Sequence, residues 1–160
     1  MKLQPASPDR RGFTLIELIV AMAVLAIIAV VAAPAFGEYF ATQRVKSAAE
    51  ELLTDFQYAR MESVQRNAAV AVNMASNGYT ITQGANTLKS VTLASGSSVS
   101  SGSTVVATFE PTRGTAALPN GGVVTLANSG TSRTLRVTIS PIGRVNICSP
   151  SGALKGYDAC

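Results

Sequence analysis

The sequence contains no histidine among its 160 residues. This absence excludes Ser-His-Asp and Cys-His nucleophilic schemes and every metal site with an imidazole ligand. Charge is also scarce, at 14% of residues, and Glu110 and Asp158 are the only acids beyond residue 67. Two carboxylates are too few for a hard-cation cage or an evident acid–base pair. We therefore expect a protein without enzyme activity, bound metal or cofactor.

Cysteine is nearly absent as well. Cys148 and Cys160 lack C-x-x-C spacing, and no P-loop or dinucleotide fingerprint occurs. Disulfides persist outside the cytoplasm. With two cysteines in the chain, one intramolecular disulfide is possible. That bridge would close a loop of about a dozen residues, worth on the order of 3 kcal/mol in the chain-entropy model. It would also hold the tail at 149–159, and two free thiols are the alternative.

The dominant feature that is present is an apolar run. Residues 18–36 carry no charge, and a helix needs roughly 20 such residues to cross a bilayer. A leader at 1–12 precedes the run, with three basic residues against one acidic residue. This bias predicts a cytoplasmic N-terminus and a C-terminal domain on the other side of the membrane. The run alone is equally typical of a simple single-pass anchor.

Glu17 distinguishes this segment from a simple anchor. A carboxylate near the end of an apolar helix costs free energy in lipid, on the order of 2.5–3.5 kcal/mol at the centre and less near the interface. A simple membrane anchor gains nothing from this unfavourable carboxylate, whereas a subunit that leaves the bilayer for a filament can use it there. Pro34 lies farther along the run, where a proline removes one backbone hydrogen bond and kinks or loosens a helix.

The residues Gly12-Phe13-Thr14-Leu15-Ile16-Glu17 closely resemble the type III signal of type IV pilins and type II secretion pseudopilins. The resemblance implies that a prepilin peptidase cuts between Gly12 and Phe13 and methylates the amino group of Phe13. It implies that Glu17 pairs with the N-terminal ammonium of a neighbouring subunit, so that other pilins are contacted through this helix. It also implies that the turn before Pro34 can unwind inside the filament; a kink at the membrane exit is the alternative.

The helix should continue beyond the membrane. Apolar and small residues recur at three- and four-residue steps, at Val45, Ala49, Leu52, Phe56, Ala59 and Ser63. One helix from about Phe13 to Arg66 is expected, with a transmembrane and assembly segment at 13–36 and an amphipathic continuation at 37–67. The second half would lie against a globular domain.

The remaining chain, residues 68–160, has the composition of β structure. The predicted strands are Ala69–Met74, Tyr79–Gln83, Leu88–Leu93, Val105–Phe109, Val123–Leu126, Leu135–Ile139 and Arg144–Ile147. Asn77-Gly78 and Asn120-Gly121-Gly122 are predicted as hairpin-type turns, and Ala94–Ser103 as a flexible loop or long hairpin tip. The fold class is thus α+β, a long N-terminal helix packed on a mainly antiparallel sheet.

Two C-terminal segments narrow the resemblance. Phe109-Glu110-Pro111 with Gly114, and the stretch 140–148 containing Gly143-Arg144, are similar to motifs of GspH/FimT-type minor pilins and pseudopilins. C-terminal disulfide loops are common among pilins, which favours the bridge. FimT-type members are implicated in DNA uptake, with two arginines of this last strand binding DNA. Here Arg144 matches the first, and Asn146 replaces the second.

Basic residues elsewhere bear on the same hypothesis. Beyond the helix six basic residues stand against two acids, a net charge of +4. Arg133, Arg136 and Lys155 could join Arg144 on a phosphate backbone of double-stranded DNA. The simpler interpretation is a solvated, solubilising surface.

Together these features predict a minor pilin of a type IV pilus, in its priming or tip complex. It would be inserted once in the bacterial inner membrane with a periplasmic domain, and later incorporated into the filament. Two alternatives remain: a GspH-type pseudopilin of a type II secretion system, and a DNA-binding subunit for natural transformation.

Overall fold

The computed structural model describes residues 13–160 except 120, 151 and 153. The leader and the predicted cut site at Gly12 lie outside the described residues. Among these described residues, one helix, α1 (Leu15–Gln65), is followed by ten strands. The chain forms two compact units, which meet between Phe36 and Gly37.

The first unit contains the apolar part of α1. Its large side chains from Phe13 to Phe36 are at least half exposed, and α1 is the one described helix long and apolar enough to cross a membrane. The helix continues through Pro34 without a break. The expected first half of the long helix is therefore confirmed.

The second half of α1 presents the predicted stripe to the core of the second unit. Val45, Ala49, Leu52, Phe56, Ala59 and Ser63 are all fully buried. The helix ends where Asn67 adopts a left-handed backbone, with φ of 49°. Asparagine tolerates this conformation better than most residues, which suits it to a helix C-terminus. Ala68 N–H then donates to Ser63 O over 3.1 Å.

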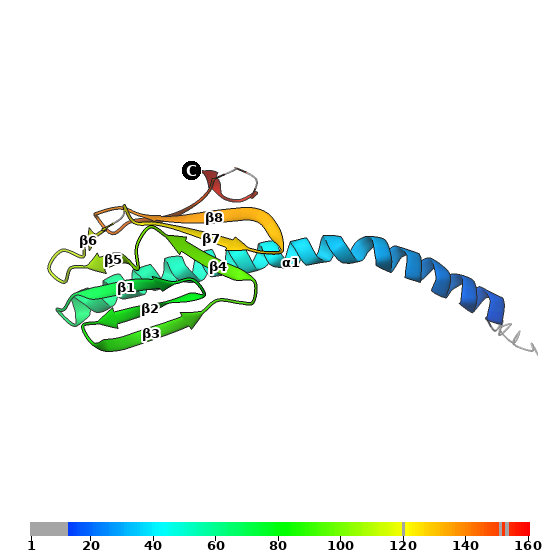
Figure 1. Cartoon of the computed structure of the whole chain (residues 1–160), viewed down its shortest axis with the longest axis horizontal. Coiled ribbons are helices and arrows are strands. Elements are labelled where there is room, and N and C mark those ends of the chain that lie inside the picture. Colours follow the sequence, from blue (N-terminus) through cyan, green and yellow to red (C-terminus); the bar gives the residue numbers. More distant parts are fainter. Residues whose placement is uncertain (1–12, 120, 151, 153) are drawn as a thin grey trace, which may run out of the picture. The chain divides into compact units, whose positions relative to one another are not determined.

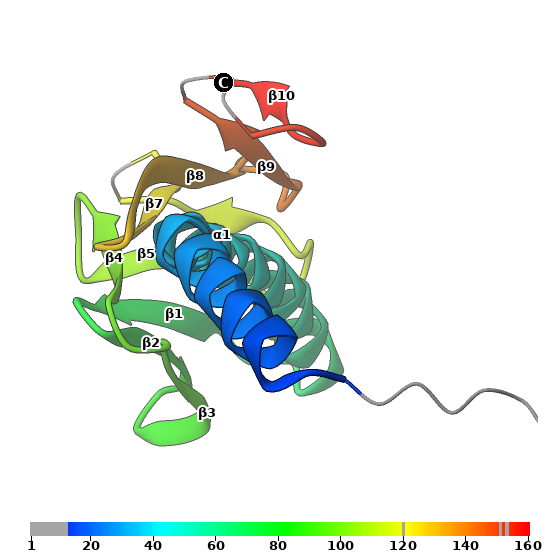
Figure 2. The ribbon, with the colours of Figure 1, turned by 90° about the vertical axis from the view of Figure 1, so that its right-hand side faces the viewer.

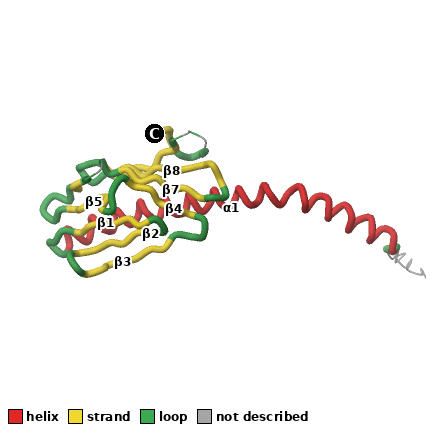
Figure 3. Tube along the Cα trace, viewed as in Figure 1, coloured by secondary structure: helices red, strands yellow, loops and turns green. Residues whose placement is uncertain are grey.

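The strands form two five-stranded sheets (Figures 1 and 3). The first sheet has the order β3-β2-β1-β5-β6, with bounds β3 (Asn86–Thr92), β2 (Gly78–Gln83), β1 (Val70–Ala75), β5 (Val105–Phe109) and β6 (Ala116–Ala117). The second has the order β10-β9-β8-β7-β4, with bounds β10 (Asp158–Ala159), β9 (Val145–Ser149), β8 (Thr131–Ile139), β7 (Val123–Asn128) and β4 (Ser97–Ser101). Every pairing is antiparallel except that of β9 with β10.

A single hydrophobic core joins the helix to both sheets. Phe56 of α1 meets Phe109 of β5 edge-to-face, with ring centroids 6.5 Å apart, and Leu135 and Val137 of β8 are fully buried in the same cluster. Figure 2 shows the two sheets on either side of this part of the helix. From Leu135 to Ile139, β8 buries every second residue, as a sheet with one face on the core requires.

All seven predicted strands are present, but two local predictions were wrong. The stretch Ala94–Ser103 is not a flexible loop throughout, because it contains β4, which pairs with β7 over five residues. Its only large apolar residue is Val99, which is 8% exposed. With so few apolar residues, this strand is recognised by its pairing with β7 and not by its composition. The turn at 120–122 is not a hairpin either. It connects β6 of one sheet to β7 of the other, and Asn120 lies outside the described residues.

Candidate functional site

The start of α1 is the first candidate site. Thr14 precedes the helix, and its Oγ1 accepts a hydrogen bond from Glu17 N–H over 3.3 Å. The order Thr-x-x-Glu is that of a capping box, which fixes the first helical turn. Glu17 thus stands in the first turn, where the positive end of the helix dipole favours a carboxylate. Residues 13–36 include no Lys or Arg, so this unit has no side-chain cation for Glu17 after the predicted cut.

The second candidate site lies where the two C-terminal motif turns meet. Gly143 ends the turn between β8 and β9, and a Cβ added to it would stand 2.8 Å from Gly114 O. Ala116 N–H donates to Pro141 O over 2.8 Å, which ties the two turns together across the sheets. Gly114 and Gly143 have φ of 59° and 75°, conformations that non-glycine residues rarely adopt. The two family motifs therefore form one structural feature.

Arg60 of α1 contacts both glycines. Its Nε would be 2.9 Å from a Cβ at Gly114 and 3.1 Å from a Cβ at Gly143. The missing side chains therefore make room for the guanidinium. This position of Arg60 was not predicted from the sequence. Its one signal was its position directly after Ala59 of the buried stripe, which places it at the border of the helix–sheet contact.

A groove of about 530 Å³ lies along this junction. It is lined by Gln57, Arg60 and Met61 of α1 and by Ile142, Gly143, Arg144 and Val145 around the β8–β9 turn. Arg60, Met61, Ile142 and Arg144 are all exposed. The groove thus combines two cations with two large apolar side chains.

The four predicted DNA-binding cations do not form one cluster. Arg144 lines the groove, whereas Arg133 lies near the opposite end of β8, where its Nε is 3.7 Å from Glu38 Oε1. Arg136 stands opposite Cys148 in the β8–β9 pairing, and its Nε is buried with no hydrogen-bond partner among the described atoms. Lys155 is exposed in the C-terminal tail. The structure therefore groups Arg144 with Arg60 rather than with the other three.

Asn146 stands one step into β9, exposed and opposite Thr138. The pairing of the two strands continues beyond β9, since Ser140 N–H donates to Arg144 O over 2.9 Å. Alternation along this extended pairing puts residues 144 and 146 on one side of the sheet.

The disulfide between Cys148 and Cys160 is present, with their Cα atoms 5.0 Å apart. The tail that it closes is held against α1. Leu154 is 2% exposed, and Tyr157 Oη donates to Glu50 Oε1 over 2.7 Å. Burial, with this hydrogen bond as the second cause, raises the pKa of Tyr157 to about 12. The predicted bridge is confirmed.

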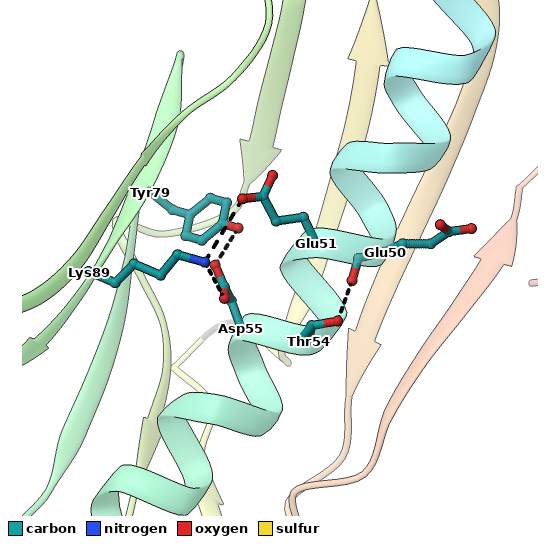
Figure 4. A network of polar contacts seen from close by, with 6 residues as sticks. All are labelled: Glu50, Glu51, Thr54, Asp55, Tyr79 and Lys89. Carbon is teal, nitrogen blue, oxygen red and sulfur yellow. Dashed lines mark hydrogen bonds and ion pairs between the residues drawn. The ribbon is translucent and has the colours of Figure 1, made fainter.

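A polar network joins the middle of α1 to the first sheet (Figure 4). Asp55 is 4% exposed, and it accepts hydrogen bonds from Tyr79 Oη and Lys89 Nζ, each over 2.7 Å. Glu51, one turn earlier, stands 3.9 Å from the same ammonium. Burial and then the hydrogen bond to Asp55 raise the pKa of Tyr79 well above its usual range. A buried carboxylate is stable here because both oxygens are satisfied.

The long N-terminal helix packed on antiparallel sheets, its exposed apolar start and the C-terminal disulfide define a pilin-like subunit. Residues 48–143 match the family described as type II transport protein GspH. Residues 7–33 match the prokaryotic N-terminal methylation motif. The chain belongs to the GspH family of type IV pilin-like proteins.

Solved structures support the same assignment. The chain resembles the type IV minor pilin FimU of Pseudomonas aeruginosa PAO1 in space group P65, with 25% identity and a TM-score of 0.54 over 69% of this chain and 97% of that one. A second crystal form of FimU, in space group P21, gives 27% identity and a TM-score of 0.53 over 71% and 95%. Among curated proteins no relative matches the sequence. The family consists of structural subunits.

Proposed function

We propose that this protein is a minor pilin of a type IV pilus that acts in its priming or tip complex. A prepilin peptidase would cut between Gly12 and Phe13 and methylate Phe13. The apolar part of α1 would first span the inner membrane, with the second unit in the periplasm, and then join the helices of neighbouring pilins. The protein's work would be assembly rather than chemistry.

The observation that carries the proposal is the position of Glu17. It lies in the first turn of an apolar helix whose large side chains are exposed, and residues 13–36 supply no basic side chain to pair with it. A new amino terminus on a neighbouring subunit would provide the missing cation. In an apolar environment such a pair is worth far more than at a surface, because water no longer screens it.

The rival role is that of a pseudopilin in a type II secretion system. The family description favours it, whereas the likeness to FimU favours the pilus. Both machines use the same architecture, so the geometry of one subunit fits either. We favour the pilus because both solved structures that this chain resembles are of a type IV minor pilin.

The test is to produce the full chain in its own cells and follow where it goes. Mass spectrometry should find a mature chain that begins at N-methyl-Phe13, and pili sheared from the cells should contain it. Glu17→Ala should leave cleavage intact, since the segment becomes more apolar, but should remove the protein from sheared pili. Glu17→Asp, which keeps the charge, is the matched control. A mature chain that begins at Met1 would refute the proposal, and loss of secretion with normal pili would favour the rival.

DNA uptake is the weaker second candidate. Arg144 is exposed and near Arg60, which favours contact with an anion. However, the other three predicted cations lie elsewhere, and Asn146 replaces the second motif arginine. A phosphate-binding surface normally gathers several cations along one face.

A further inference from the structure

Arg60 has no acidic partner in the part of the chain that the structure describes. Among the described residues, Arg66, Lys89 and Arg133 each have a carboxylate within 4.0 Å. Arg60 and Arg144 have none, and neither guanidinium donates a hydrogen bond to another described group. Two exposed cations along one groove repel each other in the free protein. An added anion would relieve this repulsion.

The groove is also built around this cation. A Cβ at either Gly114 or Gly143 would come within about 3 Å of Arg60 Nε, at 2.9 and 3.1 Å. The two motif turns therefore leave space for one guanidinium. The planar guanidinium is itself preorganised, so it loses little conformational entropy for each hydrogen bond that it forms with a carboxylate.

Apolar surface flanks the two arginines. Met61 is 65% exposed on the helix side and Ile142 is 64% exposed on the turn side, with Val64 at 54% one turn farther along α1. A phosphate backbone gains nothing from such side chains, whereas a protein segment that carries both carboxylate and apolar side chains buries them. This composition distinguishes a protein partner from a nucleic acid.

We infer that this groove is a docking site for an acidic segment of a partner protein, in which a carboxylate binds Arg60 and Arg144 while apolar neighbours cover Met61 and Ile142. The inference rests on the proposed function only in that an assembling subunit needs partners. The fork of a guanidinium matches a carboxylate in a bidentate manner. The groove would thus supply a contact outside the apolar helix, which a subunit with a defined neighbour requires for specificity.

The experiment is site-specific photo-crosslinking of the full chain in its own cells. Benzoylphenylalanine replaces Met61 or Ile142, and a control copy carries it at the exposed Ser98 on β4, an edge strand that β7 and β8 separate from β9. The crosslinked segment is sequenced by mass spectrometry. We expect one protein segment with Asp or Glu within a few residues of the attachment point.

Charge variants decide the chemistry. Arg60→Gln and Arg144→Gln should each lower the crosslink yield by about tenfold, the effect of losing one charge-assisted contact. Arg60→Lys should retain more of the yield than Arg60→Gln, and Lys155→Gln, which changes an exposed cation outside the groove, should have no effect. Arg144→Glu should lower the yield as well. A second change, of the partner's acidic residue to Lys, should then restore it.

The possible outcomes are distinct. A crosslink to nucleic acid, a partner segment without acids, or a yield no higher than at Ser98 would overturn the inference. Unchanged yield in both Gln variants would do the same. An acidic partner from a secretion machine would support the groove while it refutes the pilus assignment, so the two proposals fail separately.

Discussion

Tyr79 of β2 donates its hydroxyl hydrogen to Asp55 of α1 over 2.7 Å, and both side chains are buried. The bond crosses between the helix and the first sheet inside an otherwise apolar contact. Lys89 of the edge strand β3 donates to the second oxygen of the same carboxylate. The three residues therefore join the β2–β3 hairpin to the helix, in addition to the apolar packing between them.

We predict that Asp55→Ala lowers the free energy of unfolding of the second unit by about 1–3 kcal/mol, the cost of leaving a buried donor unsatisfied. Tyr79 would lose its acceptor, whereas Lys89, whose side chain is 39% exposed, would remain solvated. Thermal unfolding of residues 37–160, followed by circular dichroism, measures the change. Glu51→Ala is the control, since this acid is exposed and 3.9 Å from the ammonium. Equal effects of the two variants would contradict a special role for Asp55.

Alkaline pH should destabilise the second unit through its tyrosines. An ordinary tyrosine has a pKa near 10, and the pKa of Tyr157 is raised to about 12 while that of Tyr79 is raised further. The folded chain therefore keeps protons that the unfolded chain loses. Below about pH 10 the stabilisation is complete, and it decreases as the pH rises through the folded pKa values.

The measurement is a pair of titrations. Absorbance of the phenolate should show fewer late-titrating groups in Tyr157→Phe and in Tyr79→Phe than in the wild type. Chemical denaturation at pH 9 and near pH 11 should show a smaller loss of stability in Tyr79→Phe than in the wild type. If both proteins lose the same stability, the raised pKa of Tyr79 does not contribute to the free energy of unfolding.

Cys148→Ser should lower the free energy of unfolding by about 2–5 kcal/mol, the usual range when a small secreted domain loses a disulfide. The reason is that the bridge closes the chain between β9 and its end, where Leu154 and Tyr157 hold the tail to α1. Thermal unfolding with and without reductant measures the effect, and reductant should leave the variant unchanged. Two titratable thiols in wild-type protein purified from the periplasm would rule the bridge out.

Much of the fold could be predicted because it follows local patterns. The apolar run and the stripe from Val45 to Ser63 determine α1, and period-two alternation marks the longer strands. The strand β4 was missed because its sequence, Ser-Ser-Val-Ser-Ser, carries the signal of a loop. Only its pairing with β7, a contact distant in sequence, makes it a strand. Composition cannot show such pairings.

The candidate sites follow the same division. Glu17, the cysteines and the two motif turns could be found by spacing and resemblance. Arg60 could not, because its role depends on Gly114 and Gly143, which approach it only after the sheets are assembled. The sequence also could not show that the predicted DNA-binding cations lie apart. Arg133 and Arg144 are close in sequence, but β8 is extended and places them near its opposite ends.

The last prediction concerns DNA and separates a nucleic-acid surface from a structural one. If the second unit binds double-stranded DNA, binding should be largely independent of sequence and should weaken steeply with salt, because phosphate contacts release counterions. Arg144→Ala should weaken it most, and Arg133→Ala least, since Arg133 already pairs with Glu38. Asn146→Arg should strengthen it, because residues 144 and 146 share one side of the strand.

The measurement is a titration of labelled duplex at low salt with wild type, Arg144→Ala and Asn146→Arg, and with Arg113→Ala as the control for an exposed arginine of the neighbouring turn. If none binds at tens of micromolar protein, DNA uptake is excluded as a role of this subunit. If only Asn146→Arg binds, the β9 surface has the geometry of a DNA site but lacks one cation, and the natural chain does not use it for DNA.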